Sequence, residues 1–173
     1  MKILHLLPVL FIVSTTYAGS LDDARVEIAR YDQLIATAER REITLDESVR
    51  KVQRAYITLD KKTGDILAVD DLVAAEMGDG VLDIKSNRYY VRQGAIAAVR
   101  TSDTFVFTSE DGKHSKPFAW GGDILVFEKG NLQDWFLTKG LRVEHDDAEW
   151  DRMEKGLTDR FTDLIQLFKK TPK

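Results

Sequence analysis

The chain has 173 residues, a formal net charge of −4 and no cysteine. Its length suits one domain with a conventional hydrophobic core, and the absence of cysteine excludes a small fold stapled by disulfides. The acidic balance, 29 acidic against 25 basic residues, argues against a nucleic-acid groove, because such a groove needs a clustered positive surface.

The first 18 residues have the pattern of a secretory signal peptide. Lys2 precedes an apolar run, 3–13, and a polar stretch of small residues ends at Ala18. This run is too short to span a bilayer as a helix, and no later segment has the roughly 18 to 20 apolar residues that a span needs. We expect cleavage near Ala18 and a periplasmic or secreted protein. Gly19 excludes a lipid anchor on an N-terminal cysteine.

Residues 19–64 are predicted to form a helical hairpin. In 20–41, behind a candidate N-cap at Ser20, apolar residues recur at spacings of three and four. The stretch Thr44–Glu47 has the form of a capping box and begins a second apolar stripe. We expect 20–41 and 44–63 to pair as antiparallel helices.

An antiparallel β-meander of six to eight strands is predicted over residues 81–145, after a connector at 65–80. The connector suits either a short strand, 66–69, followed by a helix, or one irregular helix. In 81–145 apolar residues alternate, and turns that mostly contain glycine arrive every eight to twelve residues. The candidate strands are 81–85, 88–92, 95–100, 104–108, 116–120, 123–128, 131–137 and 141–144.

Residues 146–170 are predicted to form a long helix that lies across the sheet. Its apolar stripe runs from Trp150 to Phe168, and either Asp146 or Asp147 can cap it. A sheet needs a covered face, so we expect this helix to pack on the side of Phe105 and Phe107. The mature chain, 19–173, is therefore predicted to be a single α+β domain.

Two stretches of the β part echo each other. They are "YYVRQGAIAAVR", 89–100, and "LVFEKGNLQDWF", 125–136, which align on Gly94 and Gly130. No phosphate motif or helix start follows either glycine, so we interpret them as two neighbouring hairpins. The overlapping stretches "RYYVRQGAIAAV" and "ILVFEKGNLQDWF", together with "AEWDRMEKGLTDRFTDLIQLF", resemble small exported proteins of Gram-negative bacteria that have no assigned activity. The resemblance covers the last half of the chain and implies fold and compartment only.

Motifs for catalysis or metal binding are missing from the sequence. There is no G-x-S-x-G elbow and no glycine-rich phosphate loop. The acidic stretch 144–149 has one histidine, whereas zinc takes three or four convergent ligands, and acidic residues suit a helix start. We predict no catalytic residue, no metal and no cofactor. A carboxylate pair that hydrolyses cell-wall glycans stays open, because so many acids permit some pair.

Aromatic residues in the β part indicate a surface that binds a partner. In adjacent pairs one ring must point to each face of a sheet, and such rings anchor interfaces. The candidate contact residues are Tyr89, His114, Lys116, Trp120 and Trp135. The alternative is that the N-terminal helices cover the second face.

The function that we expect is that of an exported, non-enzymatic binding protein. It would be an inhibitor or immunity protein against an envelope-targeting effector or hydrolase, and its acidity suits a basic protein partner in the cell envelope. We expect no nucleic acid and no membrane span. The alternatives are the wall-glycan hydrolase and a structural envelope protein, for which 20–63 would extend as a free coiled coil.

Overall fold

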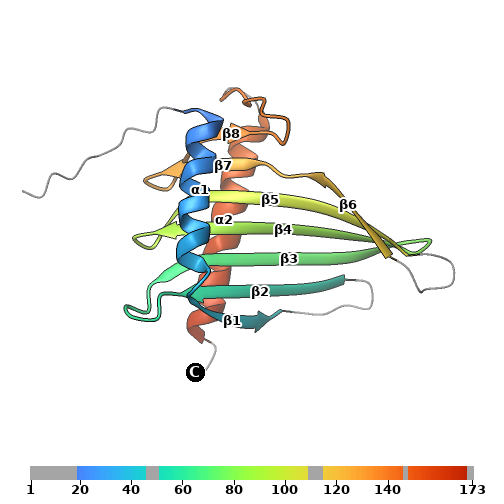
Figure 1. Cartoon of the computed structure of the whole chain (residues 1–173), viewed down its shortest axis with the longest axis horizontal. Helices are drawn as coiled ribbons and strands as arrows, with labels where there is room; N and C mark the ends of the chain where they lie inside the picture. The colour runs from blue at the N-terminus through green and yellow to red at the C-terminus, as the bar shows by residue number, and fades with distance from the viewer. Residues whose placement is uncertain (1–18, 46–50, 109–114, 146–147, 171–173) are drawn as a thin grey trace, which may run out of the picture.

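One eight-stranded antiparallel sheet with a helix on each face makes up the fold (Figure 1). The computed structural model describes residues 19–45, 51–108, 115–145 and 148–170. Helix α1 (Leu21–Ile35) crosses one face and helix α2 (Ala148–Lys170) crosses the other. The predicted α+β class, the antiparallel sheet and the C-terminal helix packed on it are confirmed.

Two predictions fall on residues outside the described ranges. They are the signal peptide, 1–18, and the helix caps Asp146 and Asp147. Among the described helices, none is both long and apolar enough to cross a membrane.

The sheet follows the order β1-β2-β3-β4-β5-β7-β8, and β6 pairs with β5 beyond β7. Strand β5 therefore has two partners along one edge: Ala98–Arg100 pair with β7, and Asp103–Thr108 pair with β6. The strands are β1 (Glu39–Thr44), β2 (Lys51–Leu59), β3 (Ile66–Gly78), β4 (Val81–Arg92), β5 (Ala95–Thr108), β6 (Ser115–Gly121), β7 (Ile124–Glu128) and β8 (Asn131–Phe136).

The predicted second helix, 44–63, is wrong, because β1 and β2 form a hairpin in its place. Ala55, Ile57 and Leu59 alternate along β2 and are all buried, which is a period of two. Pairing with β3 on the other side of β2 supplies the backbone partners that a helix would have made internally. Helix α1 likewise stops at Ile35, short of the predicted end, and the chain then enters the sheet at β1.

The predicted connector is also wrong, since residues 66–78 form the continuous strand β3. Four of the short predicted strands merge into β4 and β5, and 141–144 contributes only an isolated bridge between Phe136 and Arg142. The polar residues that resembled turns lie within strands, where Ser86 and Ser102 are joined by a 2.8 Å hydrogen bond across β4 and β5.

The two echoing stretches are confirmed as neighbouring hairpins. Gln93-Gly94 joins β4 to β5 and Lys129-Gly130 joins β7 to β8, with positive φ at all four residues. This conformation is that of a type I′ turn, which matches the twist of the strands it connects. The hairpins lie side by side because β5 pairs with β7.

The main core lies between the sheet and α2. Trp150, Leu157, Phe161 and Leu164 of the helix pack on buried residues of every strand except β6 in one hydrophobic cluster. A smaller core lies under α1, where Ile28 and Tyr31 contact Tyr90. Tyr89 and Tyr90 therefore belong to opposite faces of β4, as strand alternation requires.

Charged side chains tie each helix to the sheet. On the α2 face, Arg160 donates two 2.8 Å hydrogen bonds to the buried carboxylate of Asp71 on β3. On the α1 face, Asp32 accepts a 3.0 Å hydrogen bond from the hydroxyl of Tyr90 and ion-pairs with Arg88 and Arg100. Both helices are thus positioned by specific pairs in addition to apolar packing.

One end of the sheet extends beyond both helices (Figure 1). This distal end contains the β3–β4 turn and the outer parts of β5 and β6. Its large apolar side chains Met77, Phe107 and Phe118 are 64%, 50% and 54% exposed. The expectation that the C-terminal helix covers Phe107 is therefore wrong, because the strand is longer than the helix is wide.

Candidate functional site

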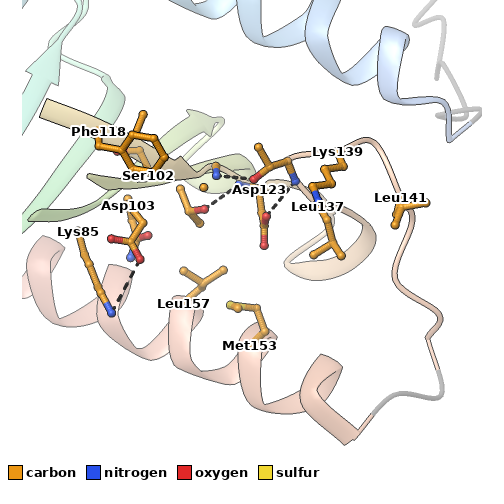
Figure 2. A pocket seen from close by; sticks show the side chains of 16 residues that line it. Lys85, Ser102, Asp103, Phe118, Asp123, Leu137, Lys139, Leu141, Met153 and Leu157 are labelled. Atoms are coloured by element: carbon orange, nitrogen blue, oxygen red, sulfur yellow. Dashed lines mark hydrogen bonds and ion pairs between the residues drawn. The ribbon is translucent and has the colours of Figure 1, made fainter. Parts of the chain in front are cut away.

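A hollow of about 840 Å³ opens on the α2 side of the sheet, where the distal end leaves the helix. We call it the β6–α2 hollow (Figure 2). Met153 and Leu157 of α2 line one side, and Phe118 of β6 lines another. The segment that follows β8 adds Leu137 and Leu141. Volumes of about 300–1,000 Å³ are typical of sites that bind a small molecule.

The hollow exists because β6 and β7 take different parts of β5. The chain turns between them at Gly121 and Gly122, and a Cβ atom on Gly122 would lie only 3.1 Å from the carbonyl oxygen of Thr101. The close approach of this turn to β5 therefore favours glycine, because any other residue would push the two backbones apart by a few tenths of an ångström. It leaves room under β6 that no side chain of α2 fills.

Hydrogen bonds around Asp123 hold the wall of the hollow in place. Its carboxylate accepts from the indole nitrogen of Trp135 at 2.9 Å and from the backbone N–H of Thr138 at 3.3 Å. The hydroxyl of Thr138 accepts from the backbone N–H of Gly122 at 2.6 Å (Figure 2). Since these bonds join the Gly122–Asp123 turn to the end of β8 and the residues that follow it, the hollow is preformed.

Lys85 and Asp103 lie on the polar side of the hollow, and Asp83 adjoins them without lining it. Lys85 Nζ lies 3.7 Å from Asp83 and 4.0 Å from Asp103, and Lys85 and Asp103 face each other across β4 and β5. Burial raises the pKa of Asp103, and the neighbouring Asp83 carboxyl raises it further by hydrogen bonding and by its charge, while Lys85 lowers it. The two acids can therefore share a proton. Within the described ranges, no three potential metal ligands come together.

The Asp103→Asn protein is expected to be more stable than the wild type at pH 7. A folded-state pKa above the ordinary value of 3.8 means that the charged carboxylate costs stability at neutral pH. This cost disappears as the pH falls through the raised pKa toward 3.8, so the advantage of asparagine should shrink over that range. Urea unfolding at pH 7 and pH 4 checks this, with exposed Asp65→Asn as the control. A less stable Asp103→Asn protein at pH 7 would contradict it.

The structure places two of the predicted contact residues in the core under α2. Tyr89 is fully buried and its ring centroid lies 5.6 Å from that of Phe161. Trp135 is 5% exposed, and its ring centroid lies 6.3 Å from that of Trp150. Neither ring can contact a partner in this state, which corrects the prediction. Helix α1 covers the second face, as the alternative had it.

The other predicted contact residues lie on or beside β6. His114 is outside the described residues, and only the backbone of Lys116 and Trp120 is described. Sequence reasoning missed Lys85, Asp103 and Phe118, although Phe118 stands between two predicted contacts. Lys85 and Asp103 lie opposite each other because of the register between β4 and β5. Each of these strands was predicted as two shorter ones, so this pairing was not predicted.

Comparison of the chain with protein-family models, curated proteins and solved structures finds no match. The resemblance to small exported proteins therefore stays a prediction that rests on the stretches quoted above. The functional proposal is drawn from the geometry of the β6–α2 hollow.

Proposed function

We propose that the protein is an exported binding protein whose β6–α2 hollow receives an apolar side chain from a basic surface of a protein partner. In the cell envelope this partner would be an effector or a hydrolase, with the protein acting as its inhibitor or immunity protein. The observation that carries the proposal is a preformed apolar hollow bordered by exposed Phe118 and Leu141, which are 54% and 64% exposed.

Apolar side chains around the hollow support a protein partner. Exposed aromatic and aliphatic groups beside a preformed pocket are the usual anchors of protein interfaces. Phe107, on the outer part of β5, extends the exposed apolar surface beyond the hollow and is half exposed. A partner that buried this surface would cover both the hollow and the distal end of the sheet.

Charge supports a basic partner. The chain has four more acidic than basic residues, while the hollow itself is lined by two acids, Asp103 and Asp123, and two lysines, Lys85 and Lys139. A negative protein attracts a positive one over distances of about a Debye length and increases the association rate. Wall hydrolases and effectors with basic surfaces would be steered toward this site.

Binding is tested with a charge placed on the rim of the hollow. Phe118→Glu is expected to weaken capture of a protein partner from envelope extracts at least about tenfold, because a hot-spot ring is replaced by a charge. Val26→Glu is the matched control, since Val26 is 71% exposed on α1, at the opposite face. Quantitative affinity capture with mass spectrometry measures both. Equal capture by the two variants, or no partner from any extract, would refute the proposal.

The other two functions have less support. Glycosidase carboxyl groups stand about 5 to 9.5 Å apart, whereas Asp83 and Asp103 are close enough to share a proton and are bridged by Lys85. A structural envelope protein was expected to extend 20–63 as a free coiled coil. Helix α1 instead packs on the sheet, and 39–59 includes two of its strands.

A further inference from the structure

A buried carboxylate lies beneath the start of α1. Asp134 of β8 is 3% exposed, and its one ion-pair partner among the described residues is Arg142. Arg142 contacts the Oδ1 atom, which is buried, but no described residue, Arg142 included, has the geometry to donate a hydrogen bond to it. A buried carboxylate oxygen without a donor is costly, so this site would be stabilised by a further cationic donor.

Gly19 lies directly against this carboxylate. A Cβ atom on Gly19 would be 2.9 Å from Oδ1, 3.0 Å from Oδ2 and 3.2 Å from Cγ of Asp134. No side chain fits at this position without displacing the Asp134 carboxylate and its ion pair with Arg142. The amino nitrogen of Gly19 is bonded to the same Cα atom, which brings it within reach of the carboxylate.

The adjoining helix start holds Gly19 in this place. Ser20 is the N-cap of α1, and its side chain accepts a 3.1 Å hydrogen bond from the backbone N–H of Asp23. Ala24 packs against Val126 and Phe136 on the sheet face, so the first turn is fixed over β7 and β8 (Figure 1). Gly19 is therefore one residue from an anchored helix cap.

We propose that cleavage between Ala18 and Gly19 creates an α-ammonium group that pairs with Asp134 and locks the start of α1 onto β8. Hydrolysis of this amide consumes one water and leaves a carboxylate on Ala18 and an ammonium on Gly19. The ammonium supplies the donor that Oδ1 lacks. The proposal rests on the export of the protein and names a consequence of processing, namely that the start of α1 is held on β8 more strongly in the cleaved chain.

Charges near the new terminus are compatible with this pairing. Arg142 and the positive end of the α1 dipole disfavour an ammonium there. Asp134 and the first-turn acids Asp22 and Asp23 favour it. Because Asp134 is buried and the other two acids lie at the exposed helix start, Asp134 has the strongest interaction.

The test compares two chains that differ by one residue, one starting at Gly19 and the other at Ala18. Both contain every described helix and strand, and the second moves the ammonium away by about 3.8 Å. In the Gly19 chain the α-amino pKa is expected to exceed its ordinary range of about 7.7–8.0 by about one unit or more, which stabilises the fold about tenfold. Titration followed by NMR measures the pKa, and urea unfolding measures the stability.

The sign of the pH dependence is fixed by the raised pKa. The extra stability of the Gly19 chain should be complete below the ordinary amino pKa and be lost as the pH rises through the raised one. Asp134→Asn should return the amino pKa to its ordinary range, and so should Gly19→Ala, which keeps the ammonium but collides with the carboxylate. Asp22→Asn is the control, because Asp22 is 89% exposed and should leave the raised pKa largely unchanged.

Two results would overturn the proposal, and each is separate from the capture assay. An ordinary amino pKa in the Gly19 chain, with unfolding midpoints equal to those of the Ala18 chain, would refute the pairing. Mass spectrometry of the exported protein showing an intact or differently cut N-terminus would refute its origin in processing. Partner capture measured with Phe118→Glu fails or succeeds independently of both.

Discussion

The Arg160→Ala protein is expected to lose about 3 to 5 kcal/mol of unfolding free energy, because the change leaves a carboxylate buried without its partner. Asp71 is 5% exposed, and Arg160 donates both of its 2.8 Å hydrogen bonds. Removing the guanidinium thus strands a charge that cannot reach water. The free energy of unfolding of a typical domain is about 5 to 15 kcal/mol, so the loss should be evident in urea unfolding at pH 7.

Arg152→Ala is the matched control for this change. Arg152 is an exposed arginine on the same helix, and its removal should cost less than about 0.5 kcal/mol. Replacing both partners, as in Asp71→Leu with Arg160→Met, should recover most of the loss, because no charge is then left buried. Equal effects of Arg160→Ala and Arg152→Ala would show that the pair does not hold α2 on β3.

The Leu164→Ala protein is expected to lose about 2 to 5 kcal/mol, since the change opens a cavity in the main core. Leu164 is fully buried between α2 and the sheet. Leu167→Ala makes the same chemical change one turn along the same helix, where the side chain is 40% exposed, and should cost less than about 1 kcal/mol. Denaturation followed by circular dichroism compares the two.

A small loss for Leu164→Ala would mean that α2 covers the sheet without contributing much to stability. The structure argues otherwise, because the buried residues of α2 belong to the same cluster as those of every strand except β6. Removing one of its fully buried side chains should therefore weaken the packing of the whole sheet on this face, with no change in the α1 face.

Local patterns in the sequence predicted much of this fold correctly. The alternation of apolar residues and the glycine turns of 81–136 indicated hairpins. The structure has positive φ at Gln93-Gly94 and at Lys129-Gly130, as a tight hairpin turn requires. The stripe from Trp150 onward indicated a long helix with one apolar face. Both signals come from residues close together in the sequence, and neither depends on which helix or strand packs against the element.

The second helix failed because residues 44–63 have two periodicities at once. Its apolar positions fit a helix stripe, but Ala55, Ile57 and Leu59 also alternate, and β3 offers a partner for the whole of β2. Strand formation depends on such non-local pairing more than helix formation does. The same reason explains why β3 was predicted as a connector. Its mixture of apolar and acidic residues has no strand pattern of its own, and it forms a strand because β2 and β4 pair with it on either side.

The sequence by itself determined the α+β class, the hairpins joined by type I′ turns and the two helices at the ends of the chain. Tertiary structure alone decided the candidate site. Burial of Tyr89 and Trp135 depends on where α2 lies, and the Lys85–Asp103 pair depends on the register of two long strands. The β6–α2 hollow depends on β5 having two partners along one edge. These features arise from contacts between residues far apart in the chain, which local periodicity does not encode.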